Sequence, residues 1–276
     1  STIEMRAGSE LSLVRATDGI GIRLFTGDII VNAVAQRDRH LAVQTRDMSI
    51  AVAGTTSLVK TAQDGSRLTG WLLLPANHVP GFRLPLVTIV YPGFVHSQNV
   101  PSDFSPFYVN FEHAQLFAAM GYAVLLPSMP QAKDPAQSHA LPQLLNGVMP
   151  AIDAAIANGV ADSDRIAVLG QSDGGFAVLG LITQTNRFRS AMASASFSNF
   201  ASLYGTFYGQ YRHGDQGRPE SGQLLRMLQL EKGSMGMVGP PWKEPDRYRE
   251  NSAINYVQKV ETPLLLIHGE NDFIPI

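Results

Sequence analysis

The sequence predicts an α/β protein with a mostly parallel sheet, preceded by a short all-β segment. From about Leu58 onward, apolar runs typical of buried strands alternate with runs of helical periodicity, which indicates a parallel sheet with helices on both faces. Residues 1–54 instead hold only short apolar runs with turn residues between them. The chain has 276 residues, of which 45% are hydrophobic and 16% charged, so it can build one large domain with a packed core.

The all-β segment is assigned to residues 1–57. Its apolar runs, separated by turns such as TDG, TGD and RDRH, predict an antiparallel sheet, and the runs are LSLVRA, IGIRLF, IIVNAVA, LAVQTR and SIAVA. Two interpretations stay open at this point. The segment is either the last part of a β-propeller or an N-terminal sheet extension of the main domain.

Residues 58–276 are assigned to the α/β domain. A hairpin that turns at Asp64-Gly65 is expected to open it. A helix over residues 144–160 has one apolar face, and Pro150 is expected to kink it. The other expected elements are a strand in 84–93, a helix and a strand in 112–127 that Gly121 separates, a strand in 164–170, a helix in 174–184, and strands in 189–196 and 262–269.

Composition excludes several classes of protein. The net charge of −2 and the lack of a long basic run argue against a nucleic-acid surface, and the apolar runs are too short to span a bilayer. The absence of cysteine excludes disulfides, cysteine nucleophiles and cysteine-ligated zinc, but it leaves the compartment open between cytoplasm and periplasm. We therefore expect a protein with neither a nucleic-acid nor a membrane partner.

A motif for nucleophilic catalysis lies in the stretch RIAVLGQSDGGFAVLGL. Gly170, Ser172 and Gly174 form the pattern G-x-S-x-G between a predicted strand and a predicted helix, which is the context of a nucleophile elbow. The sharp turn projects the serine oxygen above the sheet edge, and the two glycines leave room for neighbouring backbone. A glycine-rich phosphate-binding loop is the alternative, but the spacing fits neither of the common phosphate motifs.

A serine nucleophile also needs donors for the oxyanion that forms on the substrate carbonyl. The backbone N–H of Asp173, directly after the serine, is one candidate. Tyr91 stands at the tip of the strand VTIVYPGF and is the other, since its hydroxyl can donate a hydrogen bond. The alternative for Tyr91 is that its ring caps the core and its hydroxyl stays in water.

The candidate acid is Asp272, which follows the apolar strand PLLLIHG by a few residues. In the α/β-hydrolases the serine comes first in the chain, the aspartate follows a later strand, and the histidine comes last. Ser172 and Asp272 stand in this order. An aspartate in an ordinary surface turn is the alternative.

At these residues the chain resembles the prolyl oligopeptidase family of serine peptidases, which includes dipeptidyl peptidases and acylaminoacyl peptidases. The resemblance covers about Leu58 to Ile276 and rests on DGSRLTGWLLLP, YPGF, GYAVLLP, GQSDGGF with FRSAMASASFSNF, and VETPLLLIHGENDFIP. It implies an α/β-hydrolase domain with a preceding β-propeller, the nucleophile Ser172, the acid Asp272, and oxyanion donors from Tyr91 and Asp173.

The chain departs from the family pattern at three places. Asp173 stands where the family often has an aromatic residue, and YPGF stands where it often has two glycines. The family histidine lies a few tens of residues after the acid, and the chain has no residues there. His268 is expected to pack or to cap its turn, and His96 is the only other histidine considered as a base.

An aromatic stretch, FASLYGTFYGQY, follows the strand after the elbow, and a long loop-rich insertion is expected after it. The resemblance implies that this stretch helps to line the pocket for the residue before the scissile bond, with Tyr204, Phe207 and Tyr208 as candidates. Ordinary core or lid packing of these rings is the alternative.

The expected function is that of a serine peptidase or amidase that cleaves small peptides through a Ser-His-Asp triad and needs no metal or organic cofactor. The expected partners are a small peptide substrate and the remaining part of the same enzyme, namely the propeller blades and the histidine segment. The given chain alone is expected to be nearly inactive. A carboxylesterase, a peptide isopeptidase and a non-catalytic pseudo-hydrolase remain alternatives.

Overall fold

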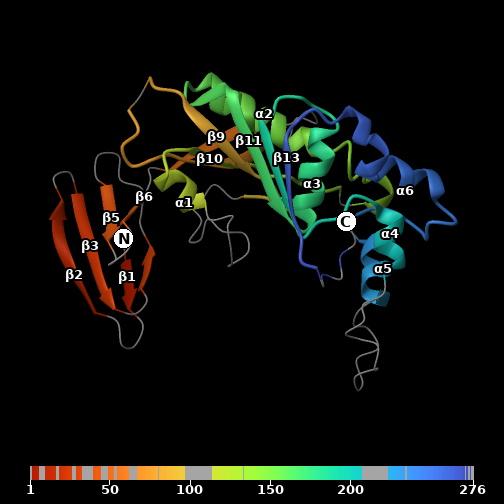
Figure 1. The fold of residues 1–276 in the computed structure, drawn as a ribbon, viewed down its shortest axis with the longest axis horizontal. Helices are drawn as coiled ribbons and strands as arrows, with labels where there is room; N and C mark the ends of the chain where they lie inside the picture. The colour runs from red at the N-terminus through yellow and green to blue at the C-terminus, as the bar shows by residue number, and fades with distance from the viewer. Residues whose placement is uncertain are drawn as a thin grey trace, which may run out of the picture.

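The computed structural model describes residues 2–5, 10–16, 19–26, 29–32, 40–44, 49–52, 55–61, 67–79, 81–96, 114–132, 134–206, 223–233, 235–270, 272 and 274. A seven-stranded sheet organises the larger part of them (Figure 1). Its strand order is β13-β12-β11-β9-β10-β8-β7, in which β8 pairs antiparallel with both of its neighbours and all other pairs are parallel. The predicted α/β class with a mostly parallel sheet is confirmed. The strands are β7 (Thr55–Thr61), β8 (Arg67–Leu73), β9 (Leu84–Ile89), β10 (Ala123–Leu126), β11 (Ala161–Gln171), β12 (Ser190–Ser194) and β13 (Leu264–Ile267).

Helices cover both faces of this sheet, as the alternating pattern predicted. In β10 the side chains of Ala123 and Leu125 join one apolar core, and those of Val124 and Leu126 join the other, because successive residues of a strand point to opposite faces. The first core also contains side chains of α2 (Leu144–Ala157) and α3 (Asp173–Ile182), and the second contains those of α1 (Ala114–Ala119). The sheet therefore lies between two helical layers.

Several element ends differ from the expected ones for local reasons. Helix α2 runs through Pro150 as one element and ends before Gly159, whose φ of +74° is left-handed. Strand β11 is longer than expected and carries a register shift between Ala161 and Ile166. Strand β12 stops at Ser194 because Ala195 takes a φ of +42°, which breaks the extended backbone.

The segment after β12 contains more regular structure than the sequence indicated. Helix α4 begins after Asn199, whose side-chain Oδ1 accepts hydrogen bonds from the N–H groups of Ala201 and Ser202. Helices also occupy part of the stretch expected to be loop-rich. These elements are α4 (Phe200–Gly205), α5 (Gln223–Lys232), α6 (Pro245–Asn251) and the 3-10 helix η3 (Ala253–Lys259), and a shorter 3-10 helix, η1 (Pro135–Gln137), precedes α2.

The N-terminal strands form two small sheets rather than one antiparallel sheet. In the four-stranded sheet β2-β3-β5-β6, strands β3 and β5 pair in parallel, because β4 leaves to pair with β1 and the chain must cross back. This order differs from the meander of a propeller blade, and the propeller interpretation stays a prediction. The strands are β1 (Thr2–Met5), β2 (Glu10–Ala16), β3 (Gly19–Thr26), β4 (Ile29–Asn32), β5 (His40–Gln44) and β6 (Ser49–Val52).

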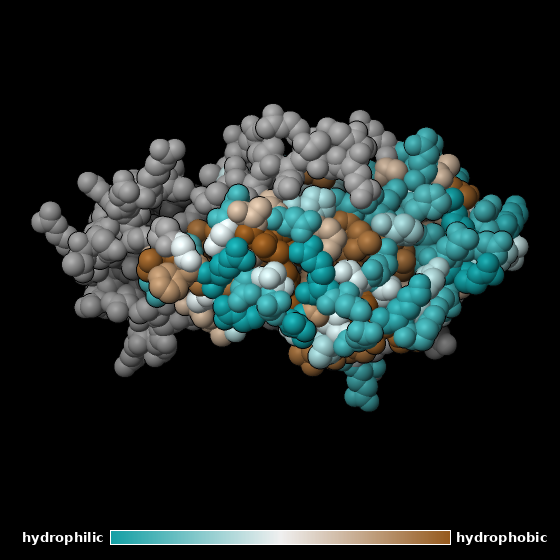
Figure 2. Space-filling model, turned by 90° about the horizontal axis from the view of Figure 1, so that it is seen from above, coloured by the Kyte–Doolittle hydropathy of each residue, from teal (hydrophilic) through white to brown (hydrophobic). Residues whose placement is uncertain are grey.

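The surface of the described residues mixes polar and apolar side chains. Figure 2 shows hydrophobic residues interspersed with polar ones on the face seen from above. No helix in the described ranges has the length and apolar character needed to cross a membrane.

The close contact between α2 and the segment after β10 gives a stability prediction. A Cβ on Gly147 would lie 2.7 Å from the carbonyl oxygen of Ser128 and 3.1 Å from the Cα atom of Met129. Helix propensity alone favours alanine over glycine by about 1 kcal/mol. We expect this contact to outweigh propensity, so that Gly147→Ala lowers the free energy of unfolding by about 1–3 kcal/mol in urea titrations. The neighbouring Asn146 is exposed, and Asn146→Ala should leave stability equal or higher. A stabilised Gly147→Ala variant would contradict the contact.

Candidate active site

Ser172 lies at the corner between β11 and α3 with a strained backbone. Its φ of 57° and ψ of −121° lie outside the regions that a residue with a side chain normally adopts. Two backbone hydrogen bonds hold the corner, from Ser172 N to the carbonyl oxygen of Ser194 at 2.9 Å and from Phe176 N to that of Ser172 at 3.0 Å. The side chain is half-buried at the carboxyl end of a central strand.

The two glycines of the motif are required by close approaches. A Cβ on Gly170 would lie 2.4 Å from the carbonyl oxygen of Gly174. A Cβ on Gly174 would lie 2.4 Å from the carbonyl oxygen of Val90 and 3.1 Å from Cδ2 of Tyr91. The first turn of α3 therefore packs directly against the end of β9, which brings the ring of Tyr91 beside the serine corner.

Tyr91 begins a tight turn that leaves β9. Phe94 N donates to the carbonyl oxygen of Tyr91 at 3.3 Å, Pro92 takes the second position, and Gly93 takes the third with a φ of +87°. This is a type II β-turn, whose third position favours glycine. Two hydrogen bonds tie the turn to the segment after β10, from Gly93 N to the carbonyl oxygen of Met129 and from Met129 N to that of Phe94, both 2.7 Å. The loop that carries Tyr91 is thus anchored on both sides.

Asp272 lies in the turn after β13 with its side chain 17% exposed. Its N–H donates to the carbonyl oxygen of Gly269 at 3.0 Å, and its Oδ1 accepts from Ile274 N at 3.0 Å. Backbone pairing connects this turn to the serine corner. Ser194, whose carbonyl oxygen accepts from Ser172, pairs with Ile267 of β13. Ser172 and Asp272 therefore both follow the carboxyl ends of parallel strands at the same edge of the sheet.

Two of the described histidines lie near these elements, and both contact groups other than Ser172. Nε2 of His268 donates to the carbonyl oxygen of Ile274 at 2.8 Å and lies 3.9 Å from Oδ2 of Asp272. His96 forms a bridge with Thr69 of β8, which is three strands from β11, or about 14 Å at the usual strand spacing. Burial lowers the pKa of His96 below its ordinary value. Among the described residues, no hydrogen bond joins a histidine to Ser172.

Tyr204 is 7% exposed, and its hydroxyl donates to Oε1 of Glu231 in α5 at 2.6 Å. Its ring meets those of Trp242 and Tyr248 edge-on, with centroid distances of 5.7 and 6.0 Å. Removal from water and the hydrogen bond to Glu231 together raise the pKa of Tyr204 to about 12. The other two pocket candidates, Phe207 and Tyr208, lie outside the described residues.

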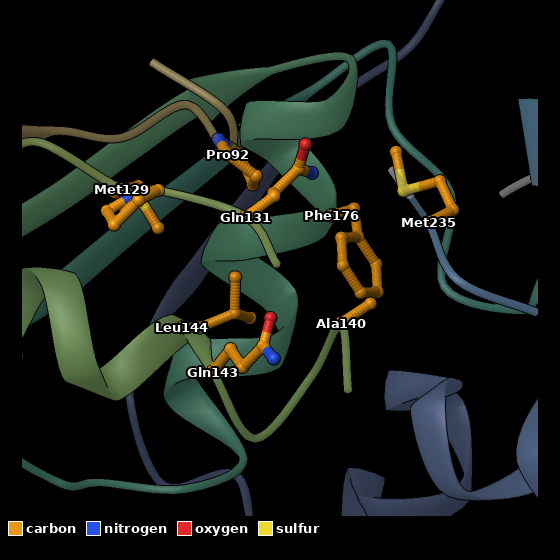
Figure 3. Close-up of a pocket in the computed structure, with 9 residues that line it drawn as sticks. Pro92, Met129, Gln131, Ala140, Gln143, Leu144, Phe176 and Met235 are labelled. Carbon is orange, nitrogen blue, oxygen red and sulfur yellow. The ribbon is translucent and has the colours of Figure 1, made fainter. Parts of the chain in front are cut away.

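A small pocket adjoins the loop that carries Tyr91. Figure 3 shows Pro92 and Met129 on one side of it and Met235 on the other. Phe176, one helical turn after Ser172, also lines it. Arg247 connects two segments that line the pocket. Its guanidinium donates hydrogen bonds to the carbonyl oxygens of Ser138 and Gly236, which are close in sequence to the lining residues Ala140 and Met235.

Sequence reasoning missed the residues that hold these parts together. Ser128, Glu231 and Arg247 follow no motif, and each acts through a partner that is distant in sequence or in another element. Within the described ranges, no group of three or more His, Cys, Asp or Glu side chains is placed to hold a metal ion.

Comparisons with known proteins point to one family of peptidases. Residues 142–234, which include the elbow, match the model of the prolyl oligopeptidase family. The chain is 29% identical over 224 residues to the uncharacterized peptidase YuxL of Bacillus subtilis, which covers 76% of this chain and 29% of that protein. It is 30% identical over 210 residues to the acylamino-acid-releasing enzyme of Arabidopsis thaliana, which covers 70% of this chain and 24% of that enzyme. The chain thus spans less than a third of the length of these relatives.

Solved structures show the same fold. The acylaminoacyl peptidase of Pyrococcus horikoshii superposes with a TM-score of 0.57 at 17% identity, over 97% of this chain and 46% of that one. A putative dipeptidyl aminopeptidase IV of Bacteroides ovatus superposes with a TM-score of 0.56 at 20% identity, over 81% of this chain and 29% of that one. The predicted α/β-hydrolase fold is therefore confirmed, and residues 142–234 of the chain match the prolyl oligopeptidase family in sequence.

Proposed function

We propose that the chain is the catalytic part of a serine peptidase that cleaves small peptides. The strained corner at Ser172 carries this proposal, because such a backbone persists where the surrounding structure is built to hold it and is common at active sites. The family match and the relatives named as peptidases support the same reaction class.

In the proposed mechanism, Oγ of Ser172 attacks the scissile carbonyl as a histidine removes its proton. The negative charge on the carbonyl oxygen is stabilised by the backbone N–H of Asp173, directly after the nucleophile, and by the hydroxyl of Tyr91, whose ring lies against the first turn of α3. Asp272 orients the histidine, which later donates its proton to the leaving amine. Strands β11 and β13 are two strand spacings apart, or about 10 Å. An imidazole with a hydrogen bond of about 2.8 Å on each side can bridge most of this gap.

We expect Ser172→Ala in the full-length enzyme to lower kcat by about 10⁴-fold or more, since nucleophile and base act as a unit. The measurement is hydrolysis of an aminoacyl anilide. Ser163, exposed near the opposite end of β11, provides the control, and Ser163→Ala should keep full activity. Near-normal turnover by Ser172→Ala would exclude the mechanism.

We infer that the general base is a histidine outside these 276 residues, on a segment of the same enzyme. Of the described histidines near the site, His268 bonds to the carbonyl oxygen of Ile274, and His96 lies beside β8, three strands from β11. In addition, the apolar residues of edge strand β13 are 37–56% exposed, although a parallel strand of this kind is normally covered on both faces. A segment that carries the histidine would also cover β13.

The 276-residue chain should therefore react much more slowly with a fluorophosphonate probe than the full-length enzyme, because its serine lacks a base. Labelling is followed by gel fluorescence over time, with Ser172→Ala as the blank for both forms. Equal labelling rates of the two forms would refute an external histidine. Failure of the full-length enzyme to label would instead favour a non-catalytic binding role.

A carboxylesterase on the same fold is the alternative activity, because the site geometry does not determine the leaving group. Comparison of kcat/KM for aminoacyl anilides and for nitrophenyl esters distinguishes the two. A clear preference for simple esters would replace the peptidase proposal.

For the pocket that binds the residue before the scissile bond, we propose that the ring of Tyr204 supports the wall while its hydroxyl holds α5 through Glu231. Tyr204→Phe should lower the free energy of unfolding by about 1–2 kcal/mol, because the Glu231 carboxylate loses a donor. The hydroxyl of Tyr256 bonds to a backbone carbonyl at an exposed position, so Tyr256→Phe should change stability by less than about 0.5 kcal/mol.

The ring is tested separately. Tyr204→Ala should shift the kcat/KM ratio between a proline-type and a bulky substrate by about 1–3 kcal/mol, whereas Tyr204→Phe should leave that ratio unchanged. If Tyr204→Ala affects stability alone, the ring belongs to the core and the pocket lies elsewhere.

A further inference from the structure

One buried hydroxyl connects three parts of the chain next to the candidate oxyanion loop. Ser128 lies two residues after β10 and is 2% exposed. Its Oγ accepts a hydrogen bond from the backbone N–H of His96 at 2.8 Å and donates to the carbonyl oxygen of Thr69 in β8. A single side chain therefore satisfies two backbone groups that come from different elements.

The same segment holds the turn that follows Tyr91. As described above, Met129 exchanges two backbone hydrogen bonds with Gly93 and Phe94. Ser128 fixes the chain two residues further on, at His96. The segment that contains Ser128 and Met129 cannot move away from the loop, because Gly147 of α2 packs directly against the carbonyl oxygen of Ser128. The loop is thus attached along its length to a rigid support.

At its other end the loop is attached to the elbow. Val90 N donates to the carbonyl oxygen of Leu169 at 3.0 Å, which extends the pairing of β9 with β11, and Gly174 lies against the Tyr91 ring. A turn with one fixed end can still rotate. The bonds at Ser128 and Met129 remove that freedom, so the direction of the Tyr91 side chain depends on both attachments.

We propose that Ser128 is a positioning residue that sets the orientation of Tyr91 toward the oxyanion. It acts through the loop and does not touch the substrate. This inference rests on the proposed function, in which Tyr91 donates to the oxyanion. An oxyanion donor is effective only when it is held in place before the reaction, and an error of about 1 Å can cost up to about 100-fold in rate.

The first test is Ser128→Ala in the full-length enzyme. We expect kcat to fall by about 10-fold with KM within about threefold of the parent value, because the loop keeps its bonds to Met129 but loses its distal anchor. Should this variant fold poorly, Ser128→Cys keeps the side-chain size and has weaker hydrogen bonds, and its kcat should be intermediate. An unchanged kcat in a folded Ser128→Ala or Ser128→Cys variant would overturn the proposal.

Ser252 provides a closely matched control. It is also 2% exposed, and its Oγ also accepts from one backbone N–H, that of Phe200 at 3.0 Å, and donates to one carbonyl, that of Tyr248 at 2.6 Å. Ser252→Ala should lower Tm by an amount similar to Ser128→Ala and leave kcat unchanged. Equal losses of kcat in both variants would show that the effect is general destabilisation.

A double-mutant cycle separates positioning from other roles. Tyr91→Phe alone should lower kcat by about 10–10³-fold. If Ser128 acts through the Tyr91 hydroxyl, Ser128→Ala should have almost no further effect on kcat in the Tyr91→Phe background. If the kcat losses of the two single variants multiply in the double variant, the proposal is overturned. The proposed function fails separately, if Ser172→Ala retains activity or Tyr91→Phe keeps the parent kcat.

Discussion

The strained backbone of Ser172 is the constraint on which the candidate site depends. A residue with a side chain adopts a φ of 57° together with a ψ of −121° only when its neighbours hold it there. Here the hydrogen bond to Ser194 fixes the corner to the next strand, and the close approach of Gly170 to Gly174 closes it from within. Any larger residue at either glycine would push the corner open and turn the serine away from the sheet edge.

The order of the strands places the residues of the proposed site around this corner. On one side, β9 delivers the loop of Tyr91 against the first turn of α3. On the other side, β12 and β13 deliver the turn of Asp272. Because parallel strands share one carboxyl edge, residues that are about 80–100 positions from Ser172 in the chain meet at that edge without a long search of loop conformations.

Much of this arrangement could be predicted from the sequence, because it is encoded locally. The elbow is contained in five residues between a strand and a helix, and Pro92-Gly93 specifies its own turn. The two hydrogen bonds of the Ser128 side chain could not be predicted, since they connect Thr69 and His96 through a residue that belongs to no motif.

The prediction of one antiparallel sheet for the N-terminal strands was wrong for a similar reason. Their existence follows from local apolar runs, but the parallel pair β3–β5 depends on β4 leaving to pair with β1. That choice is made by contacts between distant residues, which no local pattern records. The helical content of the insertion was missed because α5 is only ten residues long and stands between stretches rich in glycine, proline and charge that favour loops.

The two sides of the serine corner differ in how completely the described residues support them. The side that carries Tyr91 is anchored by Ser128, Met129 and α2, so the oxyanion donors can be held in place by these residues alone. The side that carries Asp272 follows an edge strand whose apolar residues remain exposed. In the proposed mechanism, electrostatic stabilisation and proton transfer therefore depend on different parts of the polypeptide. We infer that the first is built into this chain, while the second requires the segment that covers β13.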